Sequence, residues 1–127
     1  MVKIILRGCN GKMGQVISKL LAEDNEAELV AGIDIRDDGH NPYPVYQNIR
    51  DCRKDAQCLI DFSSAVAWDD MLEYCLEKKM PCVLCTTGLS EAQLEKIDRA
   101  SAHIAVLRSA NMSLGINLLM KVLKNAA

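Results

Sequence analysis

The chain has 127 residues, of which 50% are hydrophobic and 25% are charged, and its formal net charge is −2 at pH 7. A chain of this length fits one domain and buries roughly two-thirds of the surface that its unfolded form exposes, so a stable core needs no disulfide bonds or structural metal. The near-neutral charge excludes the basic surface typical of nucleic-acid binding and the polybasic patch typical of membrane attachment. We therefore expect small-molecule partners, with no nucleic acid and no membrane.

The amino terminus and the cysteines indicate a cytoplasmic protein. The first apolar run, VKIIL at 2–6, is too short for a secretory signal, and no apolar run reaches the length of about eighteen residues that spans a membrane. Most of the six cysteines lie in apolar runs, where a free cysteine packs as a small hydrophobic side chain. We interpret them as reduced thiols. No spacing of cysteine and histidine is typical of a zinc site, so no metal is expected.

The first third of the chain predicts a strand, a helix and a second strand. The run at 2–6 is typical of a buried strand, and apolar residues recur at helical spacing over 11–24. The stretch AELVAGID at 27–34 predicts the second strand. Such a βαβ unit has parallel strands and a right-handed crossover.

The remaining chain continues the alternation of strand and helix. After a polar loop at 35–44, VY can start a short edge strand, and QNIRDCRK at 47–54 is helix-like. The later strands are expected at 57–64, 81–88 and 103–110, and the helices at 66–79, 90–102 and from 114 onward, with a capping box between Ser90 and Gln93. This order predicts an α/β fold, a Rossmann-like doubly wound parallel sheet with helices on both faces, as one domain over 1–127.

The final expected helix is apolar on more than one side. Leu118 and Val122 lie off its main apolar stripe. Either a second domain outside this chain or another subunit covers it, or it packs deep in the sheet face, so a homo-oligomer through this helix is one expectation. The main stripe consists of Ile116, Leu119, Met120 and Leu123.

The motif GCNGKMG at 8–14 connects the first strand to the first helix and indicates a diphosphate site. Its glycines follow G-x-x-G-x-x-G, a weaker pattern than the commoner G-x-G-x-x-G. The N–H groups and the dipole at a helix amino end favour an anion, and glycines let the backbone approach phosphates closely. Asp34 ends the second strand, where an acid meets the ribose hydroxyls of the adenosine.

Two arginines near this motif leave alternatives open. Arg36 either binds the 2′-phosphate of an NADP-type cofactor through its guanidinium or is a solvated loop residue. Arg7, just before the first glycine, either contributes to the diphosphate site or is solvated. The sequence therefore leaves NADH and NADPH undecided.

Four motifs follow one another along the chain: GCNGKMG at 8–14, DFSS at 61–64, CTTG at 85–88 and SANMSLGIN at 109–117. In these motifs the chain resembles the dihydrodipicolinate reductases, also called 4-hydroxy-tetrahydrodipicolinate reductases, of bacterial lysine and diaminopimelate synthesis, and the resemblance covers nearly its whole length. It implies that the chain is the NADH- or NADPH-binding domain of an oxidoreductase that transfers a hydride to a cyclic imine dicarboxylate.

The resemblance also implies the cofactor contacts, although the family usually has glycine where Cys85 stands and phenylalanine where Met112 stands. The implied contacts are Gly8, Cys9, Asn10, Gly11, Lys12 and Met13 at the diphosphate, Asp34 and Arg36 at the adenosine ribose, Phe62, Ser63, Cys85, Thr86 and Thr87 at the nicotinamide end, and Ser109, Ala110, Asn111 and Met112 at the end of the last strand.

The catalytic groups of the resembled family are not expected in this chain. In that family a second domain carries a His-His and Lys motif and an S-G-T motif, which bind the dicarboxylate and supply the proton. This chain contains neither, and we interpret His40 and His103 as structural. We assign no catalytic residue, expect the chain alone to be inactive, and expect the dicarboxylate to bind only with the further domain.

Two other classes of protein compete with this interpretation. A stand-alone NAD(P)-sensing module would have the same fold and the same glycine loop. A redox-active thiol protein is suggested by the C-x-x-C of Cys82 and Cys85, but their odd spacing in a strand sends the side chains to opposite faces. Cys9 lies at a helix amino terminus, which favours a thiolate that alkylation would detect.

Overall fold

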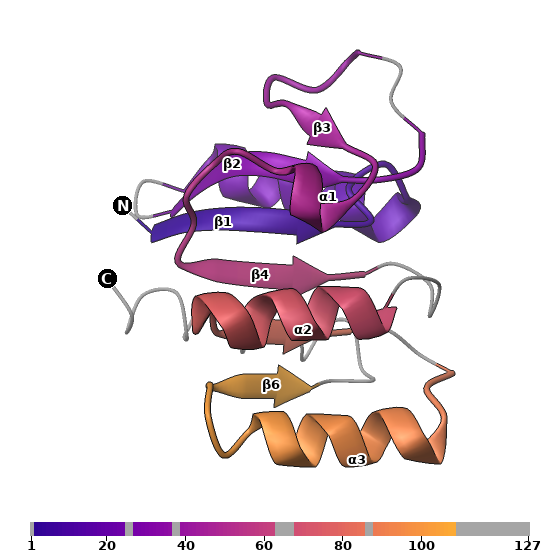
Figure 1. Ribbon diagram of the computed structural model, residues 1–127. Coiled ribbons are helices and arrows are strands. Elements are labelled where there is room, and N and C mark those ends of the chain that lie inside the picture. The colour runs from indigo at the N-terminus through magenta and orange to yellow at the C-terminus, as the bar shows by residue number, and fades with distance from the viewer. Residues whose placement is uncertain (1, 25–26, 37–38, 63–67, 86–87, 109–127) are drawn as a thin grey trace.

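The computed structural model describes residues 2–24, 27–36, 39–62, 68–85 and 88–108. They form one six-stranded sheet flanked by helices (Figure 1). In chain order the elements are β1 Val2–Arg7, α1 Lys12–Ala22, β2 Ala27–Ile33, β3 Val45–Tyr46, the 3-10 turn η1 Ile49–Asp51, β4 Cys58–Asp61, α2 Trp68–Lys78, β5 Cys82–Leu84, α3 Glu91–Ala100 and β6 Val106–Arg108.

The sheet is doubly wound, which confirms the predicted fold class. Its strand order is β3-β2-β1-β4-β5-β6, and every neighbouring pair is parallel. Because the strands are parallel, their carboxyl ends lie at one edge, toward which the arrowheads point in Figure 1, and the strand order reverses between β1 and β4. Open sheets of this kind bind ligands outside that edge, at the point where the strand order reverses.

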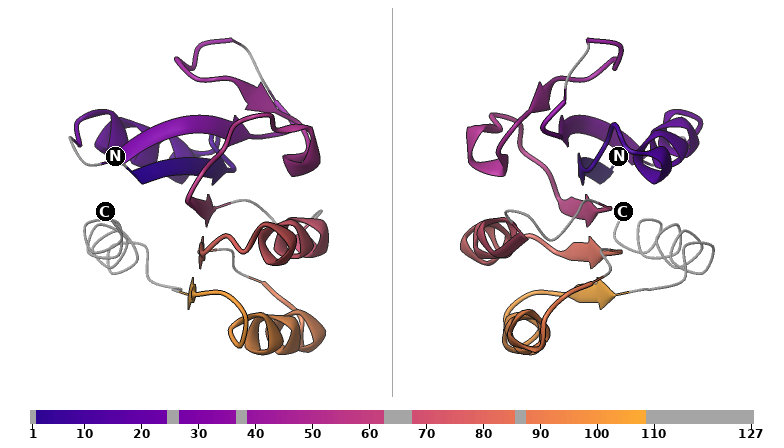
Figure 2. Two further views of the ribbon diagram at one scale, coloured as in Figure 1. Left: turned by 60° about the vertical axis from the view of Figure 1, so that its left-hand side comes forward. Right: turned by 90° about the vertical axis from the view of Figure 1, so that its right-hand side faces the viewer.

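Alternate residues of the central strands pack into two separate core layers. Ile4 and Leu6 of β1 belong to a cluster with Ile17 of α1, whereas Ile5 belongs to a cluster with Trp68 of α2. Figure 2 shows the corresponding layers, with α1 on one face of the sheet and α2 and α3 on the other. The near-continuous apolar runs of these strands follow from burial on both faces.

The capping box predicted at the start of α3 is present. The Gln93 backbone N–H donates to Ser90 Oγ over 3.2 Å, and the Ser90 backbone N–H donates to Gln93 Oε1 over 2.9 Å. The strand expected over 103–110 begins later, at Val106, because the end of α3 continues into a turn. In that turn the N–H groups of His103 and Ile104 both donate to the Ala100 carbonyl.

The helix expected over 47–54 is only the short turn η1. Asn48 caps it by accepting from the Arg50 N–H over 2.9 Å, and the backbone is already extended at Cys52 as the chain leaves toward β4. Arg50 attaches this turn to α2 through ion pairs of 2.8 Å to Asp70 and 2.9 Å to Glu77. The helical tendency of this segment is therefore limited to one turn, because the chain must then extend to connect β3 with β4. The helix expected from residue 114 onward lies outside the described residues.

Candidate functional site

The glycine loop lies between the end of β1 and the start of α1, at the carboxyl edge of the sheet. Gly8 has φ +83°, a left-handed conformation that glycine adopts without strain. Its N–H donates to the Ile33 carbonyl over 2.7 Å, which fixes the loop to the end of β2. Gly11 occupies the N-cap of α1 and has no side chain to accept from the first turn, which also contains no acidic residue. The amino end of α1 is therefore left to favour an external anion.

The two later glycines of the motif have different roles. A Cβ on Gly14 would lie 2.1 Å from the Gly8 carbonyl oxygen and 2.8 Å from Cys9 Cα, so only glycine lets α1 pack against the loop. A Cβ on Gly11 would meet its nearest atom, again the Gly8 oxygen, at 3.5 Å, which is an ordinary contact. Packing accounts for Gly14, whereas the space at Gly11 is open to a ligand.

Asp34, the first residue after β2, lies directly against this loop. Its Oδ2 accepts from the Asn10 backbone N–H over 3.0 Å, and its Oδ1 accepts from the Arg36 backbone N–H over 3.1 Å. Each carboxylate oxygen has further lone pairs, so the group can also accept from hydroxyls of a ligand. The structure thus brings together the acid and the glycine loop that the sequence connected only by their order.

Ile35 borders the candidate site and was not among the residues expected from the sequence. Its side chain is 78% exposed although it is apolar, and in the sequence it lies between Asp34 and the exposed Arg36. An isolated exposed isoleucine is common on protein surfaces, but here it borders the candidate site. The signal in the sequence is an apolar residue in an otherwise polar segment, immediately after the acid.

Arg7 is not solvated, so that alternative from the sequence is wrong. Arg7 ends β1 and is only 6% exposed, and its Nη1 lies 2.9 Å from Oδ1 of Asp61, which is fully buried at the end of β4. The two residues face each other across the β1–β4 pair, where the strand order reverses. Asp61 was not predicted as a site residue. Opposite charges at the last positions of two apolar strands were the available signal.

Phe62 and Cys85 extend the site along the same edge. The Phe62 N–H donates to the Arg7 carbonyl, and the Cys85 N–H donates to the Asp61 carbonyl, each over 2.9 Å. Both residues therefore continue the ladder of the sheet just beyond β4 and β5. The other residues expected at the nicotinamide end, Ser63, Thr86, Thr87, Ser109, Ala110, Asn111 and Met112, lie outside the described residues.

Cys9 is fully buried, which contradicts the expectation of an accessible thiolate. The loop turns its side chain inward over Gly32, where an added Cβ would lie 2.5 Å from Cys9 Sγ. Cys82 and Cys85 belong to core clusters on opposite faces of the sheet, as their spacing predicts. Burial raises the pKa of Cys85 to about 11. The C-x-x-C motif is therefore not a redox site, and all six cysteines are free thiols.

Brief alkylation of the native chain with iodoacetamide at pH 8 should modify Cys52 alone. Cys52 is half-buried whereas the other five thiols are buried, and burial also raises the pKa of Cys52, so the reaction should be slow. Peptide mass mapping identifies the modified residue, and the same treatment in urea should label all six. Labelling of Cys9 as fast as Cys52 would contradict the burial described above.

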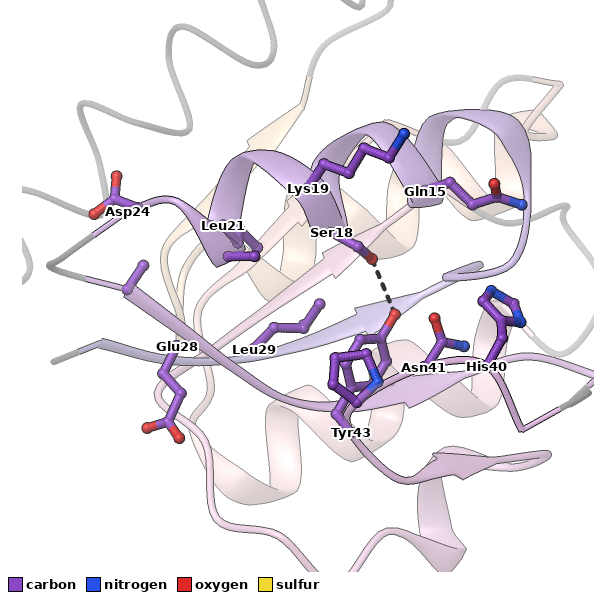
Figure 3. A pocket seen from close by; sticks show the side chains of 13 residues that line it. Gln15, Ser18, Lys19, Leu21, Asp24, Glu28, Leu29, His40, Asn41 and Tyr43 are labelled. Carbon is purple, nitrogen blue, oxygen red and sulfur yellow. Dashed lines mark hydrogen bonds between the residues drawn. The ribbon is translucent and has the colours of Figure 1, made fainter.

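A pocket of about 550 Å³ runs along α1 (Figure 3). Ser18 and Tyr43 hydrogen-bond across it over 2.9 Å, and burial raises the pKa of Tyr43 to about 12. None of the residues expected to contact the cofactor lines it. Gln15 and Asn41, which lie at one end of this pocket, also contact the loop residue Asn10.

Within the described ranges, no group of three or more His, Cys, Asp or Glu side chains is placed to hold a metal ion. In the same part of the chain, no helix has the length and apolar character needed to cross a membrane.

The fold and the site together define a Rossmann-like α/β domain with a glycine loop and an acid at the edge where such sheets bind ligands. A family model described as "Dihydrodipicolinate reductase, N-terminus" matches residues 2–112. The chain belongs to the dihydrodipicolinate reductase family, which confirms the resemblance found in its motifs.

Curated relatives agree with this assignment. The chain is 43% identical over 127 residues to a 4-hydroxy-tetrahydrodipicolinate reductase of Caldanaerobacter subterraneus subsp. tengcongensis, and 46% identical over 125 residues to that of Clostridium novyi. The two matches include 100% and 98% of this chain but only 50% of each relative. The chain therefore spans about half the length of the curated relatives it matches.

Two solved structures share the fold. Dipicolinate-bound dihydrodipicolinate reductase from Paenisporosarcina sp. TG-14 has a TM-score of 0.76 at 22% identity, over 96% of this chain and 52% of that one. GenD2 from gentamicin A biosynthesis, solved in complex with NAD, has a TM-score of 0.72 at 12% identity, over 87% of this chain and 34% of that one.

Proposed function

We propose that the chain is the NADH- or NADPH-binding domain of a 4-hydroxy-tetrahydrodipicolinate reductase. Such an enzyme would transfer a hydride to a cyclic imine dicarboxylate in lysine and diaminopimelate synthesis. The observation that carries the proposal is the glycine loop opening α1, with the Asp34 carboxylate held on the Asn10 N–H where the sheet reverses its order. The names of the relatives support the reaction, and the NAD complex of a protein with the same fold supports the cofactor class.

At the adenosine end, the described residues fit such a cofactor. The open amino end of α1 and the space over Gly11 would accept the diphosphate, alongside the exposed Lys12. The Asp34 carboxylate would accept from the ribose hydroxyls, and the exposed Ile35 side chain would lie against the adenine face. The guanidinium of Arg36 would bind the 2′-phosphate of NADPH.

At the nicotinamide end, Phe62 and Cys85 would border the ring, together with the motif residues implied by the family resemblance. The cofactor supplies the hydride when bound, and this chain's residues bind it, orient it and exclude water. His103 lies in the turn before β6, at the opposite edge of the sheet from the site. We propose that the dicarboxylate contacts and the proton donor come from residues of a longer protein, and that the chain alone is inactive.

Calorimetric titration with NADH and NADPH tests this function. The unaltered chain should bind both cofactors, and Arg36→Ala should weaken NADPH binding about tenfold or more because a charge-assisted bond to the phosphate is lost. The same variant should leave NADH binding nearly unchanged, whereas Asp34→Ala should weaken NADH. Arg53→Ala, which removes another exposed arginine, serves as the control. Absence of binding for both cofactors at millimolar concentration would overturn the proposal.

A further inference from the structure

Asn10, in the glycine loop, connects three segments of the chain. Its backbone N–H donates to Asp34, and its backbone carbonyl accepts from Gln15 Nε2 over 3.1 Å. Its side-chain Oδ1 accepts from Asn41 Nδ2 over 2.7 Å, and its Nδ2 donates to the carbonyl of Arg36. The loop, the start of α1 and the segment after β2 therefore meet at one residue, through its backbone and its side chain.

The Arg36 carbonyl, which only accepts, and the Asn41 amide together hold the Asn10 carboxamide in one orientation. The two ends of a carboxamide differ, because the oxygen only accepts and the nitrogen only donates. With the Asn41 amide donating to Oδ1, the nitrogen of Asn10 faces the Arg36 carbonyl. The opposite orientation would place two donors against each other and two acceptors against each other. The contact with Asn41 thus stabilises the contact with Arg36.

The backbone of Arg36 is held on both sides as a result. Its N–H donates to Asp34 Oδ1 over 3.1 Å, and its carbonyl accepts from Asn10. The exposed Arg36 side chain therefore starts from a fixed backbone position. A backbone that is already fixed in the free protein loses less conformational entropy when its side chain binds a phosphate.

The position of Asn41 is itself fixed by contacts of neighbouring residues in its loop with α1 and β2. Its loop is fixed by the buried Tyr43, which hydrogen-bonds to Ser18 of α1, and by the Pro44 carbonyl, which accepts from the Gly32 N–H over 2.9 Å. Figure 3 shows Asn41 beside the first turns of α1. No sequence motif contains Asn41, and its position depends on packing along α1.

We propose that Asn41 is a positioning residue that tunes the relative affinity for NADPH and NADH through Asn10 and the backbone of Arg36. This inference rests on the proposed function. The two cofactors differ in the 2′-phosphate, whose partner would be the Arg36 side chain. NADH would depend on Asp34, which is held by backbone N–H groups and not by the Asn41 amide.

The test is a double-mutant cycle of Asn41→Ala and Arg36→Ala, with the dissociation constants of NADPH and NADH measured for all four chains. Asn41→Ala alone should weaken NADPH binding about fivefold and NADH binding less than twofold, the size expected for one lost hydrogen bond. In the Arg36→Ala background, Asn41→Ala should change NADPH binding less than twofold. A merely structural role would not vanish with Arg36.

Gln57→Ala is the matched control. Its side-chain amide also makes one hydrogen bond, accepting from the Lys3 N–H over 2.9 Å, at the edge of the sheet opposite the site. The control should alter the thermal midpoint about as much as Asn41→Ala while leaving the ratio of the two affinities unchanged. Asn41→Leu, which keeps the branching at Cγ and removes the donor, serves as a second variant and should shift the ratio in the same way.

The outcomes are distinguishable. Equal weakening of both cofactors, an unchanged ratio, or an Asn41 effect that persists in the Arg36→Ala background would each overturn the inference while leaving the proposed function intact. Failure of the unaltered chain to bind either cofactor would overturn the proposed function and this inference with it.

Discussion

Asp61→Ala is expected to lower the free energy of unfolding by about 4 kcal/mol, because it leaves the buried Arg7 guanidinium without the carboxylate beside it. Urea denaturation followed by the fluorescence of the buried Trp68 measures this loss. Much of it should return in the double variant Arg7→Met/Asp61→Leu, because an apolar pair removes both buried charges together.

An exposed ion pair of equal length provides the control. Lys96 Nζ lies 2.9 Å from Asp69 Oδ1, the same separation as in the buried pair, but both side chains are about half exposed. Asp69→Ala should therefore cost less than about 1 kcal/mol. A similar loss for Asp61→Ala and Asp69→Ala would mean that burial does not govern the strength of the pair at the β1–β4 edge.

Gly14→Ala is expected to lower the free energy of unfolding by about 3 kcal/mol, because its methyl group would press on backbone atoms that cannot rotate away. Cofactor affinity should fall as well, since the loop must shift to relieve the contact. Gly11→Ala should change stability by less than about 1 kcal/mol, since its added methyl group makes only an ordinary contact.

The same pair of variants separates packing from binding. If the diphosphate approaches the backbone at Gly11, Gly11→Ala should weaken the binding of NADH and NADPH although the fold is unaffected. Denaturation curves and cofactor titrations on both variants check this. A Gly11→Ala chain that binds both cofactors as tightly as the unaltered chain would argue against a close approach at this residue.

Much of the fold could be predicted because its cause is local and periodic. The runs around Ile5 and Leu59 are almost entirely apolar, as burial on both faces requires, and α1 has one apolar stripe. The order of strands and helices then allows few arrangements. The strand limits were less predictable: β4 and β5 have only four and three residues, and the strands expected at 57–64 and 81–88 extend past both ends of each.

The candidate site likewise has a part that could be predicted from local sequence patterns and a part that could not. Asp34 could be found because a strand, a glycine loop and an acid at its distance form a local pattern. Arg7, Asp61 and Asn41 could not, because their contacts join positions that are remote in sequence and depend on register and loop course. Arg7 beside a glycine loop suggests a phosphate ligand until the register of β4 pairs it with Asp61. The inward turn of Cys9 likewise depends on the space above Gly32.

The different closure of two helix ends has a consequence for where an anion can settle. At the start of α3, Ser90 and Gln93 satisfy N–H groups with their own side chains, whereas α1 starts at a glycine that offers none. In both helices the backbone dipole attracts negative charge to the amino end. Of the two, only α1 has no side chain of its own that accepts from the N–H groups at that end. Of these two helix ends, an external anion should therefore favour the start of α1, which lies beside the switch in strand order, over the start of α3.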